Sequence, residues 1–130
     1  MSKQIISTVD APAAIGPYSQ AVLVNGTLYM SGQIALDPKT MELVEGIEAQ
    51  TRQAFENLIA VLSAADMQTS DIVKMNIYLV DLGNFALVND VMKELFNVPF
   101  PARAAIGVAS LPKGALVEVE AVAVKVSSDE

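Results

Sequence analysis

The sequence predicts an α+β fold in which a mixed β-sheet carries two helices on one face. Three observations support this prediction. Hydrophobic residues make up 52% of the 130-residue chain. The apolar pattern switches between strand and helix periodicity along the chain. Turn sequences rich in Asn, Gly and Pro separate strand-like segments. A chain of this length can bury a real core, so residues 1–130 are predicted to form a single domain.

The first half contains a hairpin followed by a helix. In "AVLVNGTLYMSGQI", Asn25-Gly26 joins two β-prone runs, and both residues tolerate the positive φ that tight hairpins need. "DPKT" at residues 37–40 predicts a turn. An amphipathic helix is expected over roughly Glu48 to Ala64, because apolar residues recur there at helical spacing, namely Phe55, Leu58, Ile59 and Leu62.

The second half contains a strand, a helix and two further strands. "DIVKMNIYLV" is rich in β-branched and aromatic residues and predicts a strand. Asn84 is expected to cap a second helix, which ends before Pro99 and Pro101. Its buried stripe would be Phe85, Val88, Met92, Leu95 and Phe96. The stretch "FPARAAIGVASLPKGALVEVEAVAV" supplies the last two strands, which "SLPKG" separates.

The expected topology leaves one sheet face without cover. Right-handed crossovers can place both helices on the same face. Apolar residues nevertheless occupy both sides of the "DIVKMNIYLV" strand, with Met75, Ile77 and Leu79 on one side and Tyr78 and Val80 on the other. Copies of the same chain are the simplest second layer, so the sequence predicts self-association.

Composition and charge exclude several classes of function. The chain has no cysteine and no histidine, so it lacks thiolate nucleophiles, the commonest metal ligand and the usual general base. We therefore expect no metal and no organic cofactor. The formal net charge of −7 opposes nucleic-acid binding. The N-terminus shows no signal peptide and no apolar run is long enough to span a bilayer, which predicts a cytoplasmic protein without a membrane partner.

One arginine and two carboxylates stand out in the apolar C-terminal stretch. From Val117 the chain alternates strictly, which places Glu118 and Glu120 on one strand face. Arg103 could bind a carboxylate through two parallel hydrogen bonds, or it could form an internal salt bridge with one of these glutamates. Glu118 could act as a general acid or base, and Glu120 could instead pair with a lysine. Strand alternation alone does not choose between the two carboxylates.

Four further polar or small residues have both a structural and a functional interpretation. Tyr18 follows a Gly-Pro turn and is either a packed ring or part of a site. Ser31-Gly32 interrupts an apolar strand, which favours a bulge or a close approach of the backbone. Asn89 lies on the apolar side of the second helix, where its amide must be hydrogen-bonded, either to hold a loop or to support binding.

Nearly the whole chain resembles the RidA/YjgF/YER057c/UK114 family. The resemblance is carried, in order and spacing, by "APAAIGPYSQAV", "YMSGQIALDPKT", "QTRQAFENLIAVL", "DIVKMNIYLVDLGNFALVND" and "FPARAAIGVASLPKGALVEVEAVAV". The Pro-Ala-Arg signature, with a glutamate fifteen residues after the arginine, is specific for the imine-deaminase branch. The resemblance implies a chorismate-mutase-like two-layer sandwich and a homotrimer with clefts between subunits.

The same resemblance implies a hydrolase without a cofactor. Family members convert reactive enamines and imines, such as 2-aminoacrylate released by pyridoxal-phosphate enzymes, to 2-keto acids and ammonia, a form of metabolite damage control. By position, Arg103 would bind the substrate carboxylate and Glu118 would activate water. The implied substrate-binding residues are Tyr18, Ser31, Gly32, Asn89 and the backbone at Ala105.

The chain departs from the family pattern at a few positions. Ala105 stands where many members have cysteine, Ala104 replaces a frequent serine, and Gly107 replaces a frequent glutamate. Met41 and Asp66 occupy loop positions that are often glycine. Two alternative functions stay open: a module that binds keto acids or related metabolites without turnover, and a ribonuclease or translation inhibitor, activities attributed to some relatives. The acidic balance and the missing histidine count against the second.

Overall fold

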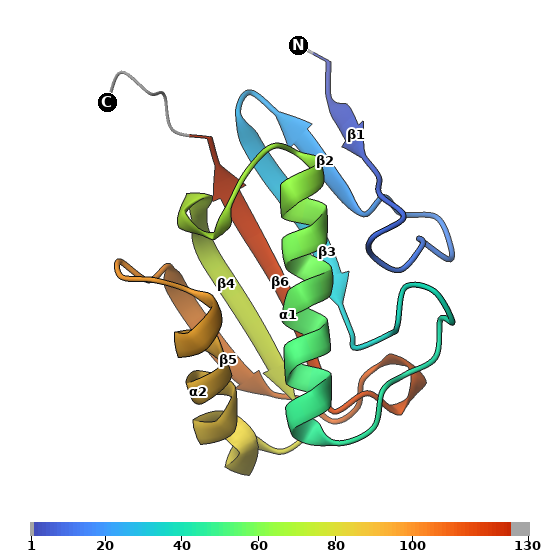
Figure 1. Cartoon of the computed structure of the whole chain (residues 1–130), viewed down its shortest axis with the longest axis vertical. Helices are drawn as coiled ribbons and strands as arrows, with labels where there is room; N and C mark the ends of the chain where they lie inside the picture. The colour runs from blue at the N-terminus through green and yellow to red at the C-terminus, as the bar shows by residue number, and fades with distance from the viewer. Residues whose placement is uncertain (1, 126–130) are drawn as a thin grey trace.

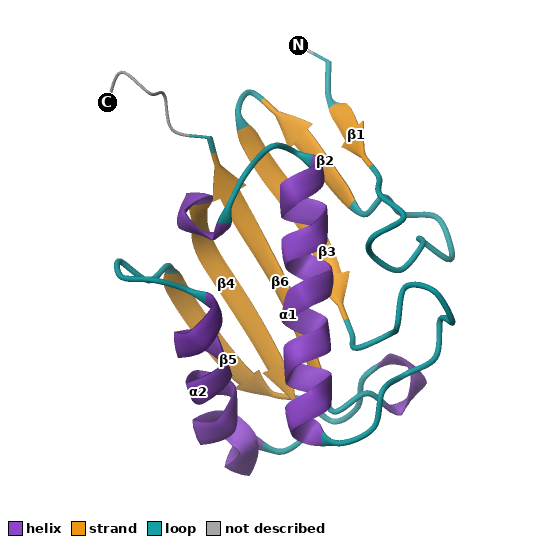
Figure 2. Ribbon diagram, in the orientation of Figure 1, coloured by secondary structure: helices purple, strands orange, loops and turns teal. Residues whose placement is uncertain are grey.

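The computed structural model describes residues 2–125, in which two helices cover one face of a six-stranded sheet (Figures 1 and 2). The strands are β1 (Gln4–Ile6), β2 (Ala21–Val24), β3 (Thr27–Gln33), β4 (Ile72–Leu79), β5 (Ala102–Gly107) and β6 (Val117–Val124). The helices are α1 (Ile47–Ala64) and α2 (Phe85–Leu95), and short 3₁₀ turns lie at Thr69–Asp71, Leu82–Asn84 and Pro112–Gly114.

The sheet has the strand order β1-β2-β3-β6-β4-β5. The pair β4–β5, which α2 connects, is parallel, and every other neighbouring pair is antiparallel. The last strand in the sequence therefore lies in the middle of the sheet, and β5 forms an edge. The predicted α+β class and the predicted order of elements are confirmed. β1 was not predicted, because it is three residues long and two of them are exposed.

Local sequence signals account for most element boundaries. Asn25 and Gly26 both have positive φ, at 51° and 79°, so the predicted hairpin turn is confirmed. The first helix begins at Ile47, one residue before its predicted start. Asn84 holds the N-cap position of α2, but its side chain makes no capping hydrogen bond. Asp81 instead accepts one from Gly83 N at 2.9 Å, in the turn that leads into the helix.

The core lies between the sheet and the two helices. On β6, Val117, Val119, Ala121 and Ala123 are at most 4% exposed and face this core. Met75, Ile77 and Leu79 of β4 are fully buried on the same side, as the strand pattern predicted. Within residues 2–125, neither helix combines the length and the apolarity needed to cross a bilayer.

The opposite sheet face is open and retains many apolar side chains. Register places on it Ile5, Val22, Val24, Tyr29, Ala104, Ile106, Val122 and Val124. Tyr29 is 53% exposed and Ile106 is 48% exposed. A sheet face of this composition is typical of a surface that another layer covers.

Candidate functional site

Glu118 and Glu120 lie on the open face of β6 and line a cavity of about 590 Å³. Its walls come from the loop before β2, from the bulged end of β3 and from the Pro112–Gly114 turn; among the residues that line it are Tyr18, Ser31, Gly32 and Lys113. The cavity therefore collects five of the residues singled out in the sequence: Tyr18, Ser31, Gly32, Glu118 and Glu120.

The Ser31-Gly32 interruption brings the β3 backbone close to Glu118. The register between β3 and β6 shifts between Met30 and Gln33, so the expected bulge is confirmed. A Cβ atom added at Gly32 would lie 2.9 Å from the Glu118 carboxyl carbon. A side chain at position 32 would push the Glu118 carboxylate aside, and glycine avoids this.

Buried amides hold the walls of this cavity. Asn57 of α1 donates to the carbonyl oxygens of Ile34 and Leu36, at 3.1 and 2.9 Å, and both of these residues line the cavity. Gln20, only 4% exposed, donates to Pro12 O at 2.8 Å and accepts from Thr8 N at 2.7 Å. The loop that carries Tyr18 is thus tied at its base to the start of β2.

Tyr18 and Ser31 occupy different parts of the wall. The Tyr18 side chain is 51% exposed and its hydroxyl accepts a 3.4 Å hydrogen bond from Ile15 N, so the ring is not a core residue. The Ser31 hydroxyl donates to Ser19 O at 2.6 Å, which fastens the residue after Tyr18 to β3. Tyr18 is left facing the cavity from a fixed loop.

The two glutamates differ in their partners. Glu120 Oε1 accepts hydrogen bonds from the Tyr78 hydroxyl at 2.5 Å and from Asn76 Nδ2 at 3.2 Å. The expectation that Glu120 pairs with a lysine is wrong, since its partners are the neutral donors that β4 places beside it. Among residues 2–125, no donor bonds to Glu118. Burial raises the pKa of the Glu118 carboxyl, and the Glu120 charge raises it further.

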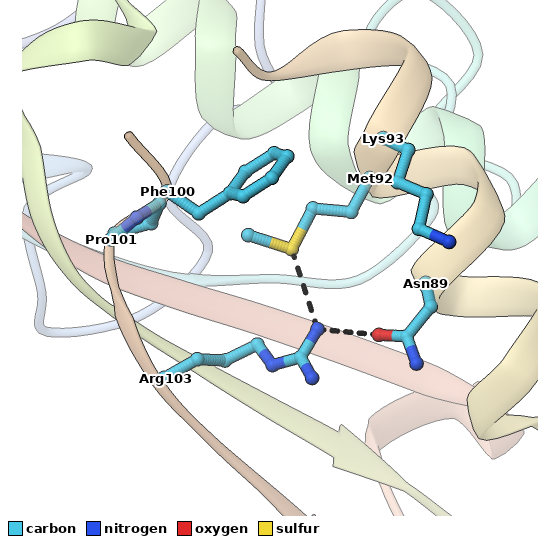
Figure 3. Close-up of a pocket in the computed structure, with 6 residues that line it drawn as sticks. All are labelled: Asn89, Met92, Lys93, Phe100, Pro101 and Arg103. Carbon is cyan, nitrogen blue, oxygen red and sulfur yellow. Dashed lines mark hydrogen bonds between the residues drawn. The ribbon is translucent and has the colours of Figure 1, made fainter. Parts of the chain in front are cut away.

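Arg103 of β5 projects toward Asn89 and Met92 of α2 (Figure 3). Its Nη1 donates to Asn89 Oδ1 at 2.5 Å and contacts Met92 Sδ at 3.7 Å. The guanidinium carbon lies 4.8 Å from the centre of the Phe85 ring, within cation–π range. The hydrogen bond of Asn89 therefore restrains the Arg103 guanidinium rather than a loop.

No carboxylate of residues 2–125 forms a salt bridge with Arg103. The internal salt bridge considered as an alternative is therefore absent from this part of the chain. Arg103 lines a second cavity, of about 470 Å³, together with Asn89, Met92, Lys93, Phe100 and Pro101 (Figure 3). Its remaining donors are available to an anion.

Arg103 and Glu118 lie on opposite faces of the same sheet. Register pairs Arg103 with Met75, which is on the helix-covered face, and pairs Glu118 with Tyr78, which is on the open face. Ala105 shares the Arg103 face and packs against the core. One chain therefore separates the predicted site residues into two groups.

Sequence reasoning did not assign site roles to Tyr78, Asn76 or Phe85. The alternation in "KMNIYLV" places Asn76 and Tyr78 on one face, but their pairing with Glu120 depends on the register between strands more than 40 residues apart. Phe85 was recognised as an apolar helix residue, not as a partner of Arg103. In the described part of the chain, no three carboxylates gather as a group that could hold a metal ion.

Comparison with known proteins covers almost the full chain. The family described as Endoribonuclease L-PSP matches residues 8–125. A 2-iminobutanoate/2-iminopropanoate deaminase of Dermatophagoides farinae is 52% identical over 123 residues, which are 94% of this chain and 96% of that protein. The protein of the same name from Bos taurus is 51% identical over 95% of this chain and 90% of its own length.

The fold is also similar to solved structures. The crystal structure of RidA from the Antarctic bacterium Psychrobacter sp. superposes with a TM-score of 0.92 at 51% sequence identity. The match covers 94% of this chain and 99% of that one.

Proposed function

The chain belongs to the Endoribonuclease L-PSP family, and we propose that it is an imine deaminase. Its reaction would be the hydrolysis of 2-aminoacrylate-type enamines and imines to 2-keto acids and ammonia. The curated relatives at about half identity are named 2-iminobutanoate/2-iminopropanoate deaminases. The observation that carries the proposal is the state of the two charged residues in residues 2–125: Arg103 has no carboxylate partner and Glu118 has no hydrogen-bond donor.

The substrate-binding half of the site would be built around Arg103. A 2-imino acid carries a carboxylate, which the planar guanidinium can hold through two parallel hydrogen bonds. Asn89 and Phe85 restrain the guanidinium from two sides, through a hydrogen bond and a cation–π contact. The backbone of the edge strand at Ala105 would contact the substrate beside it.

The chemical half would be built around Glu118. Glu118 would take a proton from water as the water oxygen adds to the imine carbon. It would return that proton to the nitrogen, which gives a carbinolamine. As the C–N bond breaks, the carbinolamine hydroxyl would pass its proton through the same carboxylate to the departing nitrogen, so that ammonia leaves and the 2-keto acid remains. Gly32 admits the carboxylate, while Tyr18 and Ser31 shape the wall. None of these steps needs a metal or an organic cofactor.

A complete site requires at least two chains, because Arg103 and Glu118 face opposite sides of the sheet. We propose a homotrimer in which Arg103 of one subunit meets Glu118 of the next across a shared cleft. The apolar open face and the unpaired edge of β5 support this assembly. Both are surfaces whose burial in an interface would be energetically favourable. A cytoplasmic location remains part of the proposal.

The alternative functions make different demands. A module that only binds metabolites needs the Arg103 clamp but has no use for a carboxyl with a raised pKa. The raised pKa of Glu118 therefore favours the enzyme. The family description suggests a ribonuclease, which has to bind RNA phosphates. A chain of formal net charge −7 without histidine is poorly suited to that task, which counts against this alternative.

The direct test is an assay coupled to a pyridoxal-phosphate-dependent dehydratase that releases 2-aminoacrylate from serine. Purified protein should accelerate keto-acid formation, with chelator present throughout. A protein that binds keto acid but leaves the rate unchanged would be the metabolite-binding module, and the deaminase proposal would then be wrong.

A further inference from the structure

Two groups on β4 hold Glu120, the second carboxylate of the Glu118 cavity. The Tyr78 hydroxyl and the Asn76 amide both donate to Glu120 Oε1, at 2.5 and 3.2 Å. The hydrogen bond to Glu120 raises the pKa of the Tyr78 phenol to about 12, so Tyr78 remains a donor at physiological pH. Glu120 is therefore a restrained carboxylate in a position that the reaction proposed above does not use.

The restrained charge of Glu120 acts on Glu118 at short range. The two side chains leave the same face of β6 two residues apart, which puts their Cβ atoms about 7 Å apart. Glu118 is half-buried, so the repulsion is less screened than it would be in bulk water. Lys113 from the turn before β6 and Tyr18 from the loop before β2 are the other titratable groups lining this cavity. In the proposed trimer, an Arg103 from the neighbouring subunit would join them.

We propose that Glu120, held by Tyr78 and Asn76, is a positioning residue whose fixed negative charge makes Glu118 a stronger base. This inference rests on the proposed deaminase function. A single carboxylate has to accept a proton from water and then release it to the departing amine, and an ordinary carboxylate is a weak base toward water. A second negative charge beside it favours the proton-bound form, which brings Glu118 closer to the operating pH. The role of Tyr78 and Asn76 is to keep that charge in place.

The test is an NMR titration of the Glu118 side-chain carboxyl carbon in ¹³C-labelled protein without substrate, with the resonance identified from Glu118→Gln. Glu120→Gln should lower the Glu118 midpoint by about 0.5 to 1 pH unit. Tyr78→Phe keeps both carboxylates and should lower it by less, since Glu120 is released but not removed. Glu56→Gln is the charge-matched control, because Glu56 is exposed on α1, which covers the other sheet face.

The pH dependence of kcat/KM supplies the second measurement. The acidic limb should move down with Glu120→Gln by the same amount as the titration midpoint, and it should stay in place with Glu56→Gln. If Glu120→Gln does not fold, Tyr78→Phe carries the test alone. A midpoint that does not fall, or falls only as far as in the control, overturns the inference. A wild-type protein without deaminase activity overturns the proposed function, whatever the titration shows.

Discussion

The Arg103 region and the Glu118 region of this chain differ in solvent exposure, in position in the sheet and in hydrogen-bond partners. Arg103 stands on an edge strand, is exposed to solvent, and is oriented by Asn89 and Phe85. Glu118 stands on the central strand, is half-buried, and has no donor among the described residues. In the proposed function the first region would hold the substrate anion, while the second keeps a carboxylate in contact with a cavity. The difference teaches that one chain keeps Arg103 and Glu118 on opposite faces of its sheet, so the proposed site needs assembly to bring them together.

The largest effect is expected from removing the base. Glu118→Gln should lower kcat by ~10²–10⁴-fold, the usual contribution of a general acid/base. The amide keeps the shape of the side chain, so binding of a keto-acid product should change much less than turnover. Glu120→Gln is the matched control, and steady-state assays should show a much smaller loss for it. A silent Glu118→Gln alongside an inactive Glu120→Gln would mean that the roles of the two carboxylates are reversed.

Next in size is the loss of the anion-holding geometry on the other side of the sheet. Arg103→Lys keeps the charge but not the planar pair of donors, so kcat/KM should fall about 10- to 100-fold. Product-binding calorimetry should report a loss of similar size. The control is Lys93→Arg, which retains a cation in the same cavity but on α2 instead of β5. If Arg103→Lys binds and turns over substrate like the wild type, Arg103 is not the carboxylate clamp.

A smaller effect is expected from filling the space that Glu118 occupies. Gly32→Ala should lower stability by roughly 1–3 kcal/mol through overpacking against the carboxylate. Combining it with Glu118→Ala should restore most of that stability, because the clash then disappears. Chemical denaturation of the single and double variants measures this coupling. If the effects of the two changes on stability are additive, the absence of a side chain at Gly32 is not what makes room for Glu118.

The smallest effect concerns stability and pH. Because the pKa of Glu118 is raised in the folded chain, the folded state binds this proton more readily than the unfolded state does. The carboxylate therefore costs stability above its folded pKa and costs nothing below about pH 4, near the value for an unfolded glutamate. In an Arg103→Ala background, which removes the neighbouring cation of the proposed cleft, Glu118→Gln should raise Tm at neutral pH, and the gain should vanish as the solution is acidified. A gain that grows toward low pH would contradict this.

Local patterns predicted the parts of the fold that depend on neighbouring residues. Asn25-Gly26 identified the hairpin, and the apolar spacing from Phe55 identified α1. β1 was missed because three residues at a sheet edge carry almost no periodic signal. Met41 and Asp66, which occupy loop positions often held by glycine, do adopt positive φ, at 61° and 58°.

The residues of the candidate site could be named from the sequence, but their arrangement in space could not. Strand alternation correctly placed Glu118 and Glu120 on one face, while nothing local indicates which face Arg103 takes. That depends on the parallel register of β5 with β4, which α2 sets. The partners of Glu120 likewise come from a strand more than 40 residues away. Gly107 illustrates the same limit: Leu82 lies 3.1 Å from where its Cβ would be, so the glutamate that is frequent there has no room without rearrangement.

The central claim, that Arg103 and Glu118 meet only between chains, has a direct test in subunit mixing. The impaired variants Arg103→Lys and Glu118→Gln are unfolded together, refolded as an equal mixture and assayed for keto-acid release. In a cyclic assembly about a quarter of the clefts would combine an intact Arg103 with an intact Glu118 from the next subunit. We therefore predict that the mixture recovers about a quarter of the wild-type activity. A mixture that assembles fully but stays no more active than either variant alone would contradict the shared site.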